Sequence, residues 1–134
     1  MKTLNVKAAI ENVPVVTEFV DEILESVDCS MKAQTQIDVV IDEIFSNIAF
    51  YAYGEEGGDA LIEVEAKEGS VKLVFSDTGK PYNPLEAEEP DITASVEDRK
   101  IGGLGIFMVK KMMDEVSYVY EEGHNRLTLV KNWE

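Results

Sequence analysis

Two consecutive stretches of the chain repeat apolar residues at the spacing of one helix face, and this periodicity limits the fold more than any other feature. The repeats follow i, i+3, i+4 and i+7, and their members are Val16, Phe19, Val20, Ile23, Leu24 and Val27, then Ile37, Val40, Ile41, Ile44, Phe45 and Ile48. Asn12 and Pro14 mark the start of the first helix, and Gly54 follows the second, which is expected over residues 32–53. Two adjacent amphipathic helices need a further layer to cover their apolar faces.

The segments around these helices alternate apolar and polar residues, as strands do. Five strands are predicted, over residues 3–9, 60–66, 71–76, 116–120 and 126–130. A third helix is expected over 104–114, after one long irregular segment, residues 77–103. The order β-α-α-β-β-loop-α-β-β predicts an α+β fold. We expect a two-layer α/β sandwich with a mixed, mostly antiparallel sheet and the helices on one face.

The charge of the chain restricts its partners. Lys and Arg number 12 against 27 Asp and Glu, and the net charge of −15 disfavours binding to nucleic acid or to an anionic membrane. No apolar run approaches the roughly 18 residues of a membrane span. Cys29 is the only cysteine, so no intrachain disulfide can form, and a reducing cytoplasm fits. At 134 residues, we expect a single cytoplasmic domain, residues 1–134.

Glu43 and Asn47 form the first candidate functional pair. They lie four residues apart in the second predicted helix, on the flank of its apolar stripe. From that flank a carboxylate and an amide can face a cleft, whereas Asp38, Asp42 and Ser46 are expected to point toward solvent. For the pair alone, the simpler interpretation is that two polar residues border the core.

The second candidate is the run from Asp77 to Pro84, directly after an apolar strand. An aspartate at a strand end can accept a hydrogen bond from an exocyclic amine. Gly79 permits a close approach of another group, and Pro81 and Pro84 prevent further strand pairing. Taken alone, this run is more typical of an ordinary Asp-x-Gly turn.

The third candidate is a glycine-rich helix start, residues 101–106. Glycines at such a position expose backbone N–H groups at the positive end of the helix dipole, which favours an anion. The run is neither a complete dinucleotide-binding fingerprint nor a Walker A loop. By itself it indicates only a helix start that could bind an anion.

In this order, Glu43-x-x-x-Asn47, then Asp77-x-Gly79, then Gly103-x-Gly105 resembles the ATP-binding domain of the GHKL superfamily. This group includes gyrase-type topoisomerases, histidine kinases, mismatch-repair ATPases and certain chaperones, which share the Bergerat-type fold. The resemblance extends over essentially the whole chain. Its compact length and the segments 47–53 and 112–116 look like the bacterial anti-sigma factors that are serine-protein kinases.

The resemblance implies ATP and Mg²⁺ as cofactors and assigns roles to individual residues. Asn47 would ligate Mg²⁺, and Glu43 would be the general base. Asp77 would accept a hydrogen bond from the adenine amine, with Gly79 beneath the base. Thr128, on the last strand, would support the adenine near Asp77.

The phosphates would be bound by the glycine-rich helix start and its neighbours. The resemblance makes residues 85–101 the ATP lid, in which Arg99 and Lys100 are the only cations and a candidate charge clamp. The residues implied at the helix start are Gly102, Gly103, Leu104, Gly105 and Ile106. Two departures are visible: Lys80-Pro81-Tyr82 lacks the second glycine of the family pattern, and Tyr51 replaces its usual histidine.

Three functions are compatible with these residues. The resemblance favours an anti-sigma factor with serine/threonine-protein kinase activity. Such a protein phosphorylates an anti-anti-sigma (STAS-type) partner, controls a sigma factor and forms a homodimer. A second interpretation is a non-catalytic ATP-sensing module, which would not need Glu43. A third is an acidic interaction domain without nucleotide, which would leave the three ordered motifs unexplained.

Overall fold

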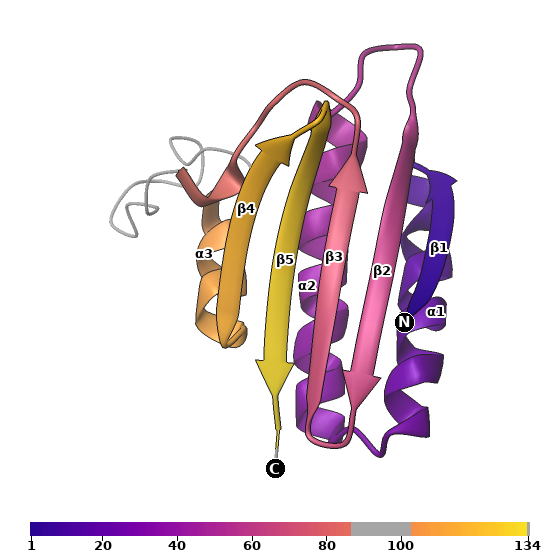
Figure 1. The fold of residues 1–134 in the computed structure, drawn as a ribbon, viewed down its shortest axis with the longest axis vertical. Helices are drawn as coiled ribbons and strands as arrows, with labels where there is room; N and C mark the ends of the chain where they lie inside the picture. The colour runs from indigo at the N-terminus through magenta and orange to yellow at the C-terminus, as the bar shows by residue number, and fades with distance from the viewer. Residues whose placement is uncertain (87–102, 134) are drawn as a thin grey trace.

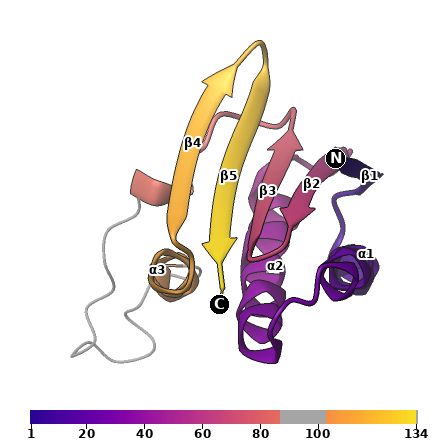
Figure 2. The same cartoon turned by 60° about the horizontal axis from the view of Figure 1, so that its bottom comes forward.

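The computed structural model describes residues 1–86 and 103–133 (Figure 1). Its strands are β1 (Lys2–Lys7), β2 (Asp59–Lys67), β3 (Ser70–Asp77), β4 (Glu115–Glu121) and β5 (His124–Asn132). Its helices are α1 (Val13–Ser26), α2 (Met31–Tyr51) and α3 (Gly103–Met112), with short 3-10 turns η1 (Ile10–Asn12) and η2 (Pro84–Glu86). All three helices cover the same face of the sheet (Figures 1 and 2).

The strands form one sheet in the order β1-β2-β3-β5-β4, and each neighbouring pair is antiparallel. The predicted α+β, two-layer architecture is confirmed, and among the described strands no parallel pair is present. β3 lies at the centre of the sheet. Its last residue, Asp77, lies opposite Ala60 of β2 and Asn125 of β5.

α2 carries most of the layer that covers the sheet. It begins one residue earlier than predicted because the Ser30 hydroxyl caps it, accepting a hydrogen bond from the Ala33 N–H at 3.1 Å. It ends at Tyr51, and the Ala52 carbonyl accepts a hydrogen bond of 3.0 Å from the Lys80 N–H. The C-terminal end of α2 is therefore joined to the segment that follows β3.

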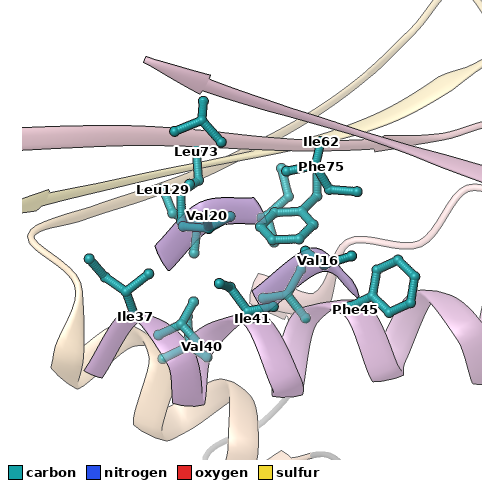
Figure 3. Packing of buried hydrophobic residues seen from close by; sticks show 14 of the residues in the cluster. Val16, Val20, Ile37, Val40, Ile41, Phe45, Ile62, Leu73, Phe75 and Leu129 are labelled. Carbon is teal, nitrogen blue, oxygen red and sulfur yellow. The ribbon is translucent and has the colours of Figure 1, made fainter. Parts of the chain in front are cut away.

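The core lies between the helices and the inward-facing residues of the sheet. In Figure 3, side chains from α1 and α2 point toward alternate residues of the strands. The labelled members, all fully buried, are Val16, Val20, Ile37, Val40, Ile41, Phe45, Ile62, Leu73, Phe75 and Leu129. Truncating one of the larger members to alanine would cost about 2–5 kcal/mol. This core fixes how α2 lies across β3 and β5.

One expected orientation on α2 is wrong. Asp42 is exposed, as its position predicts, but Asp38 is half-buried and faces Asp21 of α1. The pKa of Asp38 is raised to about 7, first by burial and then by a hydrogen bond with Asp21 and the charge of Asp21. The helical period places Asp38 away from the sheet, but α1 packs against that flank.

The remaining elements agree with the sequence in kind and differ at their ends. α3 was expected to reach residue 114 and instead ends at Met112. The Asp114 N–H donates to the Val130 carbonyl, and this bond brings the chain into the closing hairpin. Within residues 1–86 and 103–133, no helix combines the length and the apolar character needed to cross a membrane.

Candidate functional site

A pocket lies where the C-terminal half of α2 meets the end of β3, the start of β5 and Tyr118 of β4. Its walls are mostly apolar or aromatic and include Ile44, Ile48, Phe75, Tyr118 and Leu127. Few polar side chains face it, among them Asn47 and Asp77. An apolar cleft with a small number of placed polar groups is the usual form of a site for a flat organic ligand.

Asp77 is the most buried carboxylate of the pocket, with 6% of its surface exposed. Its Oδ1 accepts a hydrogen bond from the Gly79 N–H at 2.9 Å and another from Asn125 Nδ2 at 2.9 Å. Within the described residues, both bonds to this side chain end at Oδ1. Its other oxygen, Oδ2, therefore remains for a donor placed in the pocket.

Gly79 fits its position because the chain passes close to the end of α2. A Cβ atom at this residue would lie 2.0 Å from the carbonyl oxygen of Ala52. A backbone atom cannot move aside as the end of a side chain can, so only glycine fits. The position expected beneath a base stays a prediction. What the structure shows is that Gly79 seats the loop after Asp77 on α2.

Asn47 lines the same pocket from α2. Its Nδ2 atom is buried and has no hydrogen-bond partner in the described part of the chain. Buried amides are normally hydrogen-bonded, and an unsatisfied one costs about 1–3 kcal/mol. Such an atom beside a pocket is typical of a group whose partner is a ligand.

Glu43 lies one helical turn before Asn47 on α2, just beyond the described residues that line the pocket. Its carboxylate contacts the first turn of α3, because a Cβ atom on Gly105 would lie 1.8 Å from Glu43 Oε2. Burial raises the pKa of Glu43, and the neighbouring charge of Asp42 adds to the increase. From Glu43 to the residue that follows α2, Ala52, the chain rises about 13 Å along the helix axis, so Glu43 and the Asp77 end of the pocket are well separated.

The glycine-rich helix start is described only in part. Gly103 is the first residue of α3, and Gly105 is buried against Glu43. Ile106 is 3% exposed and belongs to the core, so only its backbone can face a ligand. The other positions expected at the phosphates lie outside the described residues: Arg99, Lys100, Gly102 and all but the first two residues of the expected lid, 85–101. The side chain of Leu104 is likewise not described.

The expectation that Thr128 lies beside Asp77 is wrong. Thr128 pairs with Val74 of β3 and borders a groove with Lys72 on the other face of the sheet. Alternation explains the difference, because Leu127 and Leu129 face the helices and Thr128 must face away.

Asn125 occupies the place expected for Thr128. It lies directly opposite Asp77, is 7% exposed and lines the pocket. Counting back by two from Leu127 along the predicted strand would have placed Asn125 on the inner face. The sequence therefore contained a signal for this residue.

The chain belongs to the family of histidine kinase-like ATPase domains, whose match spans residues 6–131. The match covers β2, β3, β4, the three helices and the pocket described above, together with the end of β1 and most of β5. The resemblance inferred from the order of the three motifs is thereby confirmed.

Two curated relatives have similar sequences. The serine-protein kinase RsbW of Listeria monocytogenes serovar 1/2a is 30% identical over 100 residues, which cover 70% of this chain and 63% of the relative. The serine/threonine-protein kinase BtrW of Bordetella bronchiseptica is 29% identical over 105 residues, which cover 77% of this chain and 73% of the relative. The chain thus spans less than two thirds of the length of the Listeria protein.

Two solved structures share the fold. The crystal structure of the RsbU and RsbW domains of Rv1364c from Mycobacterium tuberculosis superposes with a TM-score of 0.64 at 17% identity, covering 98% of this chain and 32% of that one. The SiaB-SiaC complex from Pseudomonas aeruginosa superposes with a TM-score of 0.59 at 15% identity, covering 98% of this chain and 89% of that one. At these identities, the likeness concerns the fold.

Proposed function

We propose that this domain binds ATP with Mg²⁺ and transfers phosphate to a serine or threonine of an anti-anti-sigma protein, thereby controlling a sigma factor. The observation that carries the proposal is the pocket that contains Asp77 and Asn47, with Glu43 one helical turn further along α2 against the first turn of α3. The names of the Listeria and Bordetella relatives, both protein kinases, support the same reaction.

The base would bind at the apolar end of the site. Adenine carries an exocyclic amine, and Asp77 Oδ2 is an acceptor not used by any hydrogen bond within the described residues. Phe75 and Tyr118 line the same pocket and can cover the faces of a flat ring. A polar acceptor within apolar walls discriminates strongly against a base that lacks the matching donor.

The phosphates would bind toward the first turn of α3, where backbone N–H groups favour an anion. The chemistry of the residues at this end of the site is compatible with a bound Mg²⁺. Asn47 offers an amide oxygen, and the described residues contain no group of three or more His, Cys, Asp or Glu that could bind a metal alone. Mg²⁺ commonly takes few protein ligands together with substrate phosphates. When bound, it would neutralise phosphate charge in a chain of net charge −15.

Glu43 would act as the general base for the attacking hydroxyl. It lies one turn from Asn47, and its raised pKa brings its proton affinity closer to the range useful for catalysis near neutral pH. Accepting the proton of a serine or threonine hydroxyl as phosphate is transferred is the role that this position permits. A module that only senses ATP would have no need of this carboxylate.

The partners rest on resemblance. The likeness to the SiaB-SiaC complex and to the RsbW domain extends to the fold alone. An anti-anti-sigma substrate, a sigma factor, a homodimer and a cytoplasmic location therefore remain parts of the proposal.

Calorimetry of ATP binding tests the proposal on the wild type, Asn47→Ala and Glu43→Gln, each with and without Mg²⁺. We expect the wild type to bind ATP, Asn47→Ala to lose the Mg²⁺-dependent part, and Glu43→Gln to bind ATP yet fail to label an anti-anti-sigma protein with γ-phosphate. Glu22→Gln, an exposed carboxylate on α1, is the matched control and should behave as the wild type. A wild type that binds no ATP would overturn the proposal, and normal labelling by Glu43→Gln would overturn the role of that residue.

A further inference from the structure

Asn125 has no role in the proposed reaction, yet its side chain forms more hydrogen bonds around the pocket than any other residue described there. It lies near the start of β5, directly opposite Asp77, and is 7% exposed. A buried amide with a full set of partners costs little to bury and holds each partner in one geometry. The identity of those partners shows what Asn125 does.

The Nδ2 group of Asn125 donates to three acceptors. These are Asp77 Oδ1 at 2.9 Å, the Lys80 carbonyl at 2.9 Å and the Gly79 carbonyl at 3.3 Å. All three belong to the end of β3 and the loop that follows it. Only a donor can satisfy this set, so the amide nitrogen must face Asp77.

The oxygen of the same amide accepts two hydrogen bonds. One comes from the backbone N–H of Tyr82 at 3.1 Å, and the other comes from the hydroxyl of Tyr118 on β4. The Tyr82 N–H fixes the orientation of the amide, since a flipped side chain would place an N–H group against it, whereas a hydroxyl such as that of Tyr118 can adapt to either group. Asn125 therefore ties the loop of residues 79–82 to both β4 and β5.

This arrangement determines which part of Asp77 faces the ligand. The Asn125 amide and the Gly79 N–H both bind Oδ1, so the plane of the carboxylate is fixed and Oδ2 is the oxygen that remains. The pocket is thus built to accept a hydrogen bond before any ligand arrives.

We infer that Asn125 is the positioning residue for the base: it orients Asp77 toward a purine 6-amino group and holds the 79–82 loop in place, so that selectivity for adenine over guanine depends on it. This inference rests on the proposed binding of ATP. Asn125 would influence the preference for adenine indirectly, through its hydrogen bond to Asp77, and would not contact the base itself.

Adenosine is the probe that isolates this end of the site, because it carries no phosphate and needs no Mg²⁺. We expect Asn125→Ala to weaken adenosine and ATP·Mg²⁺ by the same factor, about tenfold or more, and to reduce the preference for ATP over GTP. Asn132→Ala is the matched control, since Asn132 lies at the far end of the same strand and bonds with Ser70. It should leave both affinities unchanged.

A pH profile separates positioning from a general loss of stability. In Asn125→Asp, the group facing three acceptors can donate only while it is protonated. As pH rises, its ionised form repels Asp77, so ATP affinity should fall about tenfold between about pH 6 and about pH 8.5, while that of the wild type stays within about threefold. At about pH 6 the protonated carboxyl of Asn125→Asp can keep hydrogen bonds close to those of the native amide, so we expect this variant to fold. It therefore tests the inference even if Asn125→Ala does not fold.

The outcomes are distinguishable. If the wild type binds neither adenosine nor ATP, the proposed function fails. If it binds both, the inference is overturned by an Asn125→Asp affinity that is as independent of pH as that of the wild type. An unchanged preference for ATP over GTP in Asn125→Ala would overturn it equally.

Discussion

The carboxylate of Glu43 on α2 lies directly against the backbone of Gly105 in the first turn of α3, so closely that a Cβ atom at position 105 would be 1.8 Å from Oε2 and 2.4 Å from Cδ. Two motifs that are far apart in the sequence thus meet at one contact. The glycine is needed here for space, in addition to any backbone contact with phosphate. The position of the candidate base and the start of α3 therefore depend on each other.

Gly105→Ala tests this dependence through the sign of its effect on stability. In an unobstructed helix, alanine is more favourable than glycine by about 1 kcal/mol. Here the methyl group must displace Glu43, so we expect a lower free energy of unfolding and phosphotransfer reduced about 100-fold, with a smaller loss of ATP affinity. Denaturant unfolding and phosphotransfer assays measure both effects.

The Glu43→Ala background provides the decisive comparison. With the carboxylate removed, Gly105→Ala should become stabilising, and the double-mutant cycle should give a coupling of about 1–3 kcal/mol. Gly54→Ala is the control, because nothing lies within 4 Å of a Cβ atom there. Additive effects of the two substitutions would show that Glu43 and Gly105 do not interact.

Gly79→Ala should damage the base end of the site. Its Cβ atom would lie 2.0 Å from the carbonyl oxygen of Ala52, and the Lys80 N–H donates to this same oxygen. Because a backbone atom is in the way, the loop must lift from α2, which we expect to cost about 1–3 kcal/mol of stability and most of the adenosine affinity. Lys80→Ala keeps the backbone N–H and should be nearly neutral in thermal unfolding. Equal melting temperatures for the two variants would contradict the close approach.

Asp77→Asn should change which base is preferred. The amide has the shape of the carboxylate, and its oxygen can keep the bonds from Gly79 and Asn125, so its NH₂ group would face the pocket. A donor there opposes the adenine amine and suits the carbonyl at the same position of hypoxanthine or guanine. We expect ATP affinity to fall about 100-fold and the ratio of ITP to ATP affinity to rise. Competition binding measures this ratio, and a uniform loss for both nucleotides would count against the orientation of Asp77.

Periodicity predicts from the sequence that Asn47 and Asp77 lie at a cleft, and the structure places both residues in the pocket. The stripe on α2 placed Glu43 and Asn47 on one flank, and the strand before Asp77 placed that carboxylate at the end of β3. Thr128 was misplaced because it was chosen by resemblance, against the alternation of its own strand. The contact of Gly79 with Ala52 could not be predicted, since it depends on how α2 crosses the sheet.

The partner of Asp38 was hidden for the same physical reason. Its position on α2 was correctly placed away from the sheet, but the sequence does not say where α1 packs. In the fold, Oδ1 of Asp38 and Oδ1 of Asp21 are both buried and have no donor among the described residues. We expect a proton on Asp38 to lie between the two carboxyls and satisfy both atoms. The pKa of Asp38 is raised to about 7, first by burial and then by its hydrogen bond with Asp21 and the charge of Asp21.

The Asp38 pair predicts how stability depends on pH. The pKa of Asp38 is raised from 3.8 to about 7 in the folded state. The contribution of the protonated carboxyl to the free energy of unfolding is therefore fully present below about pH 4 and is lost as pH rises through about 7. Asp38→Asn can donate to Asp21 at any pH. We therefore expect Asp38→Asn to unfold with a free energy about 1–2 kcal/mol higher than that of the wild type at about pH 8, and with little difference at about pH 5. The gain is smaller than the full pKa shift would give, because the pair is only partly buried.

The reactivity of Cys29 offers a second measurement on the Asp21–Asp38 pair. The pKa of its thiol is raised by burial and then by the charges of these two aspartates. It is the only cysteine in the chain, so alkylation by iodoacetamide reports on it alone. Removing one of those charges should raise the thiolate fraction at about pH 8 and speed alkylation of Asp38→Asn several-fold. Asp42→Asn, on the exposed side of the same helix, should change neither stability nor alkylation. If both variants match the wild type at both pH values, the two carboxyls do not share a proton.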